Sequence, residues 1–150
     1  CGAGANYGTA LESALKMGET IHIPSCCYEI EEYIHGPNLQ LTPQYNVIFF
    51  DGNDGASRRV EQVYKATRKV TNRAYLISNN PQLSRDGHVL SLSDTVSSEL
   101  SPLVYLPFVQ LLSFIVSNDL HSIYQHPLLK EFKAIAAAKT ENFVNYDGDD

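Results

Sequence analysis

Two short apolar runs in the middle of the chain predict strands that are covered on both faces. Residues 46–50 and 74–77 are apolar at nearly every position, and turn-forming residues follow each run. A strand that meets water on neither side has this continuous pattern, whereas a half-exposed strand alternates. Residues 88–92 predict a third strand, and a shorter apolar piece, Ile21–Ser25, predicts a further one near the start.

Segments with apolar residues at helical spacing lie between and after these strands. The opening helix runs to about Gly18, and Asn6 or Thr9 can cap its first turn. Further helices are predicted at residues 28–35, where Gly36-Pro37 ends the helix, and at residues 57–70, 103–118 and 127–138. Apolar residues cover nearly the whole circumference of helix 103–118, so we expect that helix to be central and buried.

Strands that alternate with helices predict an α/β fold. We expect one domain over residues 1–150, built as a three-layer αβα sandwich around a mostly parallel, flavodoxin-like sheet. Ligands of such sheets bind beyond the carboxyl ends of the strands. The loops Gly2–Asn6, Pro24–Tyr28 and Asp51–Gly55 are therefore expected to gather at one edge of the sheet.

Three charged residues share one face of the opening helix. Glu12, Lys16 and Glu19 are spaced i, i+4 and i+7, which places them within roughly 60° of arc. The spacing allows two interpretations. Glu12 and Lys16 form an ordinary exposed ion pair on a solvated face, or all three side chains project into a pocket where Lys16 holds Glu19 ionised and Glu19 moves a proton.

A longer pattern surrounds these charges. The run A-L-E-x-A-L-K-x-x-E at residues 10–19 is followed by E-x-x-H-G-P at residues 32–37. This combination resembles the sugar isomerase (SIS) domain family. More narrowly, it is similar to the second SIS domain of glucosamine-6-phosphate synthase and of the fructosamine-6-phosphate deglycases, and the looser likeness extends to about Phe132. The aromatic residue after Glu32 is closer to the deglycase form.

The resemblance implies a catalytic role for three residues. Glu19 falls on the position of the family's catalytic glutamate, which moves a proton between neighbouring carbons of the open-chain sugar. Lys16 would place a cation near the developing enediolate oxygen. His35 would open the sugar ring, and it can act in the neighbouring subunit of a dimer, so the resemblance also implies a homodimer or larger homo-oligomer.

Four more residues are candidates for binding the substrate. Glu12 matches a family position and would orient Lys16, although a purely structural role is equally compatible with its spacing. Glu32 precedes His35 and could orient its ring. Gly4 and Asn6 belong to a glycine-bearing lead-in whose amides could meet a ligand oxygen, although a tight strand-to-helix turn explains the same residues.

One expected feature of the family is absent from the chain. The serine- and threonine-rich loop that holds the sugar phosphate, typically S-x-S-G-x-T, has no match here. In tandem SIS proteins that loop belongs to the first SIS domain. We therefore expect this chain to be the C-terminal half of a tandem-SIS protein whose first strand and preceding SIS domain are missing, and we expect the fragment alone to be inactive.

Composition narrows the remaining possibilities. A formal net charge of −6 argues against nucleic acid and against an anionic membrane surface as partners. The sequence contains no unbroken run of about 18 apolar residues, so it predicts no membrane span. The three cysteines favour reduced thiols in a cytoplasmic protein. No histidine or cysteine spacing predicts a metal, and no cofactor is expected. The alternative function is a non-catalytic domain that senses a sugar phosphate or only dimerises.

Overall fold

The computed structural model describes residues 1–92, 96–122 and 135, and it contains a parallel sheet with the order β1-β2-β3. Strands β1 (Val47–Asp51) and β2 (Ala74–Ser78) pair over five residues, and β3 (Val89–Ser91) pairs with β2. On the far side of β1, Gly2 forms isolated parallel bridges to Phe50 and Glu29. The three strands predicted from residues 46–50, 74–77 and 88–92 are confirmed.

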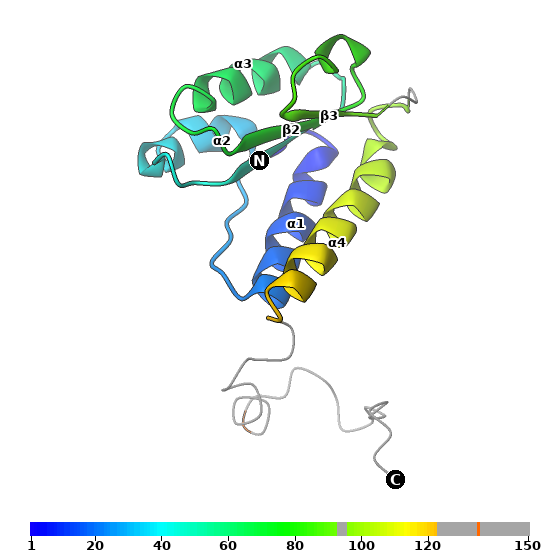
Figure 1. The fold of residues 1–150 in the computed structure, drawn as a ribbon. Coiled ribbons are helices and arrows are strands. Elements are labelled where there is room, and N and C mark those ends of the chain that lie inside the picture. Colours follow the sequence, from blue (N-terminus) through cyan, green and yellow to red (C-terminus); the bar gives the residue numbers. More distant parts are fainter. Residues whose placement is uncertain (93–95, 123–134, 136–150) are drawn as a thin grey trace.

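Helices cover both faces of this sheet (Figure 1). The helices α2 (Ile30–Ile34) and α3 (Ser57–Thr67) pack on one face, and α1 (Asn6–Ile21) and α4 (Ser101–Asp119) pack on the other. Two short 3-10 helices, Pro37–Gln40 and Pro81–Leu83, lie in the connections. The expected three-layer α/β architecture with a parallel sheet is therefore confirmed.

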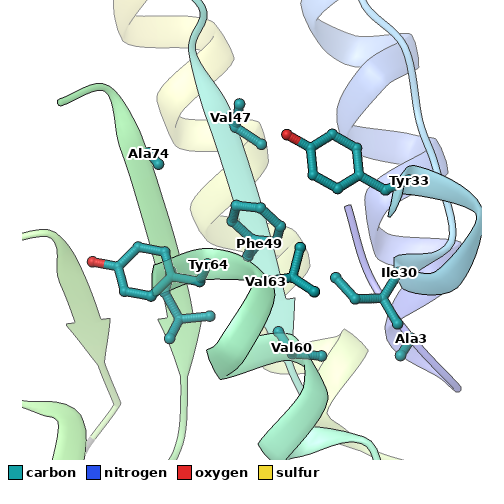
Figure 2. Packing of buried hydrophobic residues seen from close by; sticks show 10 residues of the cluster. Ala3, Ile30, Tyr33, Val47, Phe49, Val60, Val63, Tyr64 and Ala74 are labelled. Atoms are coloured by element: carbon teal, nitrogen blue, oxygen red, sulfur yellow. The ribbon is translucent and has the colours of Figure 1, made fainter. Parts of the chain in front are cut away.

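Alternation along β1 sends neighbouring side chains into different cores. Phe49 is fully buried among residues of α2 and α3, where its ring meets Tyr33 and Tyr64 edge-on at centroid distances of 5.9 and 6.0 Å (Figure 2). Phe50 points to the opposite face and stacks on Tyr105 of α4. A strand that supplies both layers in this way has to be apolar at consecutive positions, which is the pattern seen in the sequence.

The helices α1 and α4 pack side by side (Figure 1), and several of their buried residues are small and hydroxyl-bearing. The buried residues of this kind are Thr9 and Ser13 on α1 and Ser101, Ser113 and Ser117 on α4. Ser13 donates a hydrogen bond to the Thr9 carbonyl, 2.7 Å away, so its hydroxyl is satisfied within its own helix. Small inner residues let two helix backbones approach closely.

One predicted strand is wrong. No strand forms at Ile21–Ser25, because α1 continues to Ile21 and ends at His22, which has φ 61° in the left-handed region. Residues 22–26 then run exposed toward α2. The apolar residues of this stretch have no neighbouring strand to pair with, and a strand needs such a partner. The short helix predicted next, at residues 28–35, is confirmed by α2.

The expectation that helix 103–118 is buried is also wrong. The helix exists as α4, but its outer face is exposed, with Leu103 at 69%, Phe114 at 63% and Leu111 at 57%. Among the described residues, α4 is the one helix whose length and mean hydropathy of 1.3 would suffice to cross a membrane. Its inner face nevertheless packs on α1 and the sheet. The helix predicted at residues 127–138 lies outside the described residues, apart from Ile135.

The expected gathering of loops beyond the strands is confirmed. A methyl group added to Gly52 would lie 2.9 Å from Asn6 Nδ2, and one added to Gly4 would lie 3.2 Å from Asp54 Oδ2. The Gly2 amide donates to the Tyr28 carbonyl at 3.3 Å. The three loops therefore meet at the carboxyl edge of β1.

A buried carboxylate organises this edge. Asp51 is 1% exposed, and its Oδ1 accepts hydrogen bonds from the Asn53 amide at 3.0 Å and from the Ser57 hydroxyl at 2.5 Å. Its Oδ2 accepts from the Ser78 hydroxyl at 2.7 Å. The Asp51 carbonyl accepts from the Tyr105 hydroxyl at 2.7 Å, and burial together with the Asp51 charge raises the pKa of Tyr105 to about 12.

Replacing Asp51 by alanine should lower the free energy of unfolding by about 3 kcal/mol, because three donors would lose a charged acceptor in a buried site. Urea unfolding followed by circular dichroism measures this. Asp119→Ala, at the exposed end of α4, is the matched control and should change stability by less than about 0.5 kcal/mol. Equal effects of the two substitutions would contradict the organising role of Asp51.

Candidate functional site

The charged face predicted on the opening helix is present on α1, from the middle of the helix to its last turn. Lys16 Nζ lies 2.9 Å from Glu19 Oε2 and 3.6 Å from Glu12 Oε1. The side chains of Lys16, Glu12 and Glu19 are 32%, 34% and 50% exposed. We call these three residues the charged triad. The hydrogen bond from Lys16 to Glu19 raises the pKa of Lys16, with further help from the Glu19 and Glu12 charges, so Lys16 is a cation at neutral pH.

An apolar hollow of about 590 Å³ lies next to the triad. Its walls are Leu11, Ala14, Leu15 and Gly18 on α1 and Ser25 and Cys27 on the following segment, and Glu19 is the charged residue among its lining. Leu11 and Leu15 are about half exposed, at 48% and 53%, so the hollow is open to solvent. The structure therefore places a carboxylate at the border between a cationic partner and an apolar surface.

Cys27 is a lining residue to which sequence reasoning gave no role. Burial raises the pKa of its thiol, so the group is a neutral thiol rather than a thiolate at neutral pH. The adjacent pair of cysteines at residues 26 and 27 was the signal in the sequence. Spacing alone could not show that one of the two faces the hollow while the other, Cys26, is exposed.

His35 lies at the C-terminal cap of α2 and is exposed. Its Nδ1 is 2.7 Å from the carbonyl oxygen of Glu31. A carbonyl can only accept, so Nδ1 carries the hydrogen and donates it, and in the neutral ring Nε2 keeps a free lone pair. The geometry thus leaves Nε2 as the atom that can accept a proton from a ligand.

Glu32 has a structural partner in the described chain. Its Oε2 accepts from the Glu29 amide at 3.3 Å, and the Glu29 carboxylate accepts from the amides of Glu31 and Glu32, which completes a capping box at the start of α2. The ring of His35 is held by the Glu31 carbonyl and not by the Glu32 carboxylate. Any contact of Glu32 with a substrate would have to coexist with this cap.

Gly4 and Asn6 lie at the other end of α1. Gly4 has φ 54°, a left-handed conformation that suits glycine, in the turn that leads into the helix. The Asn6 side chain is buried at 1% exposure, donates to the Ser101 hydroxyl at 2.7 Å and accepts from the Thr9 hydroxyl at 3.1 Å. Its polar atoms are therefore engaged within the protein.

The seven candidate residues occupy three separate places. The charged triad lies on the last turns of α1, Gly4 and Asn6 lie at its beginning, and Glu32 and His35 lie on α2. At 1.5 Å per residue, Glu19 is about 20 Å along the helix from Asn6. Gly2 pairs with Glu29, so α2 starts near the beginning of α1. Within residues 1–92 and 96–122, His35 makes no hydrogen bond or ion pair with the triad.

A metal site is not evident in the part of the chain that the structure describes. There, no group of three or more histidine, cysteine, aspartate or glutamate side chains is placed to hold an ion.

Comparisons with known proteins relate this chain to enzymes of sugar-phosphate metabolism. No protein-family model matches the chain. In sequence it is 31% identical over 122 residues to the isomerising glutamine–fructose-6-phosphate aminotransferase of Methanothermobacter thermautotrophicus, which covers 79% of this chain and 20% of that enzyme. The corresponding enzyme of Xylella fastidiosa is 28% identical over 115 residues, which covers 75% of this chain and 19% of that enzyme. The chain thus spans about a fifth of the curated relatives it matches.

Solved structures give the same relationship at the level of fold. A proposed phosphosugar isomerase from Clostridium difficile 630 superposes with a TM-score of 0.78 over 94% of this chain and 39% of that chain, at 23% identity. The tagatose-6-phosphate ketose/aldose isomerase of Escherichia coli gives 0.70 at 16% identity, over 79% and 35% of the two chains. The C-terminal domain of the glucosamine–fructose-6-phosphate aminotransferase of Francisella tularensis gives 0.64 at 23% identity, over 77% and 34%. The resemblance noted in the sequence is confirmed.

Removing the cation of the triad should cost little stability. Lys16→Met is expected to lower the free energy of unfolding by less than about 0.5 kcal/mol, because exposed ion pairs on a helix contribute no more than that. Thermal unfolding measures the change. Lys65→Met is the matched control, since Lys65 pairs with Glu61 at i, i+4 on α3. A much larger loss for Lys16→Met alone would show that the triad is a structural element of the fold.

Proposed function

We propose that this chain, which has the fold of the sugar isomerase (SIS) domains, is the catalytic domain of a protein that acts on a phosphorylated sugar. The observation that carries the proposal is the charged triad at the border of the hollow on α1. The sequence similarity to isomerising aminotransferases and the structural similarity to phosphosugar isomerases support the reaction class. An amino-sugar or fructosamine 6-phosphate is the proposed substrate.

In the proposed mechanism, the Glu19 carboxylate removes a proton from the carbon next to the carbonyl of the open-chain sugar. The electron pair of that C–H bond forms the enediol, and the carbonyl oxygen becomes an enediolate oxygen. The Lys16 ammonium stabilises this oxygen, and Glu12 keeps Lys16 in place. Glu19 then returns the proton to the former carbonyl carbon, while the proton of the neighbouring hydroxyl group passes to the enediolate oxygen and the new carbonyl forms at the neighbouring carbon. One carboxylate thus performs both transfers to and from carbon. Release or transfer of an amine would follow at the first or second carbon.

His35 would open the ring before this step, through the lone pair on Nε2. The distance between α2 and the last turns of α1 supports a site in which His35 comes from a second subunit. We accordingly propose a homo-oligomer as the active form. A preceding SIS domain in a longer chain would supply the phosphate-binding loop, and the free cysteines Cys1, Cys26 and Cys27 are compatible with a cytoplasmic protein.

The alternative is a domain that binds a sugar phosphate without turning it over. The half-exposed carboxylate of Glu19 keeps this alternative open, because a general base works best where water is excluded. Binding of a sugar phosphate by the protein, without any exchange of substrate hydrogen with solvent, would favour the sensing function over catalysis.

Glu19→Gln in the protein that carries this domain should lower turnover by about 10²–10⁴-fold, because the amide cannot accept the proton. The measurement is product formation from a panel of amino-sugar and fructosamine 6-phosphates, together with deuterium exchange from solvent into the sugar by NMR. Glu61→Gln, which alters an exposed ion pair on α3, is the control and should leave both signals unchanged. Equal turnover by wild type and Glu19→Gln would remove Glu19 as the base.

Mixing two inactive variants tests the origin of the histidine. If His35 acts in the neighbouring subunit, dissociated and reassociated Glu19→Gln and His35→Ala proteins should recover about a quarter of the wild-type activity, since half of the dimers contain one intact site. Failure of the mixture to regain activity would place both residues in the same subunit or exclude His35 from the reaction.

A further inference from the structure

The helix that carries His35 is too short to hold its own position. α2 comprises the five residues Ile30–Ile34, and isolated helices shorter than about 12–15 residues are marginal in water. The orientation of α2 must therefore come from contacts with the rest of the protein. Because His35 is the C-terminal cap of α2, the same contacts determine where its imidazole ring lies.

Two kinds of contact hold the start and the inner side of α2. The side chains of Ile30 and Tyr33 are buried and point toward the apolar core beside β1 (Figure 2). The capping box of Glu29 and Glu32 closes the first turn. Neither contact involves the exposed C-terminal end of the helix, where His35 lies.

A groove lies between this end of α2 and the helix α3. Its volume is about 410 Å³, and Ile34 and Asn38 line it on one side while Gln62 and Ala66 line it on the other. Side chains of the described residues do not fill this space. Apolar packing between the two helices therefore leaves the end of α2 room to shift.

One polar contact joins the two walls of the groove. Arg59 of α3 donates from Nε to Glu31 Oε1 at 2.6 Å and from Nη2 to Glu31 Oε2 at 3.1 Å. Two bonds to one carboxylate fix its orientation as well as its distance. The hydrogen bond from Arg59 lowers the pKa of the Glu31 carboxyl, so the group is ionised at neutral pH. Among the ion pairs of the described residues, this is the one that joins α2 to α3.

Glu31 is also the residue that holds the ring of His35. Its carbonyl oxygen lies 2.7 Å from His35 Nδ1 and accepts the hydrogen of that nitrogen. The carboxylate of Glu31 is thus tied to α3, and its carbonyl is tied to the imidazole. Arg59 acts on His35 through the two ends of this one residue.

We propose that Arg59 is a positioning residue for His35: through Glu31 it holds the end of α2 in place and directs the free Nε2 of the ring toward the sugar. Arg59 itself does not touch the substrate. The part that Nε2 plays rests on the proposed function, whereas the tie between Arg59 and the end of α2 is measurable without substrate.

Hydrogen exchange of the backbone tests the tie. The amide of His35 donates to the Glu32 carbonyl at 3.1 Å, so its exchange with solvent reports how often the end of α2 opens. Arg59→Met is expected to speed the exchange of this amide about 5-fold, as the loss of a two-bond pair at the surface predicts. Arg58→Met, at the neighbouring exposed arginine of α3, is the matched control and should leave the rate unchanged. Two-dimensional NMR measures the rates, and circular dichroism verifies that both variants fold.

Kinetics of the protein that carries this domain test the effect on His35. Arg59→Met should lower kcat by about 3–10-fold and leave KM unchanged, because a misplaced proton acceptor slows the reaction without weakening substrate binding. Arg59→Lys keeps a cation opposite Glu31 without the planar fork and should recover part of the loss. In a His35→Ala background, Arg59→Met should not lower the residual turnover further, because no ring remains to be positioned.

Three outcomes separate this inference from the proposed function. An unchanged exchange rate of the His35 amide in Arg59→Met overturns the inference. An equal loss of kcat in the wild-type and His35→Ala backgrounds also overturns it, since the substitution would then act elsewhere. Full activity of His35→Ala contradicts the proposed role of that residue, and the exchange rate then decides alone whether Arg59 holds the end of α2.

Discussion

The buried carboxylate of Asp51 is the interaction on which the arrangement of the layers depends. It lies at the end of β1, and its two oxygens hold the start of α3 through Ser57 and the end of β2 through Ser78. Its carbonyl holds α4 through the hydroxyl of Tyr105. A buried carboxylate is stable in a folded protein only when nearly all of its hydrogen-bonding capacity is used. Four elements therefore have to end or begin at this point, and the loops between them are gathered at one edge of the sheet as a consequence.

The contact between α1 and α4 determines which residues of these two helices are exposed. Threonine and serine are among the buried residues of both helices, and small residues let two helix backbones approach closely. Tyr105 and Val109 of α4 pack on the sheet, the large residues on the outer arc of α4 are apolar and exposed, and α1 carries the partly exposed charged triad. The two adjacent helices thus present surfaces of opposite character, one apolar and one charged.

The sequence was sufficient where a pattern reflects a local cause. β1 and β2 were predicted because a strand covered on both faces must be apolar throughout, and the triad was predicted because helical spacing alone brings Glu12, Lys16 and Glu19 together. The prediction of a strand at Ile21–Ser25 was wrong because a strand needs a neighbouring strand to pair with, and the sequence of this stretch does not show whether one is present. The prediction that helix 103–118 is buried was wrong because apolar residues around a helix do not show which part of the molecule, if any within the chain, covers each face. The hollow beside Glu19 and the remoteness of His35 depend on tertiary packing, and no spacing in the sequence contains that information.

The position of the triad determines how a surface ion pair would serve the proposed reaction. Two unit charges 4 Å apart interact by about 1 kcal/mol in water and by about 4 kcal/mol at an effective dielectric constant of 20. In the single chain, Glu19 is half exposed, so its attraction to Lys16 is close to the first value. A second protein surface or a bound sugar over the hollow would move it toward the second value without shifting any atom of α1. For the proposed mechanism, the charged groups are therefore already in place on α1, and the remaining requirement is the exclusion of water.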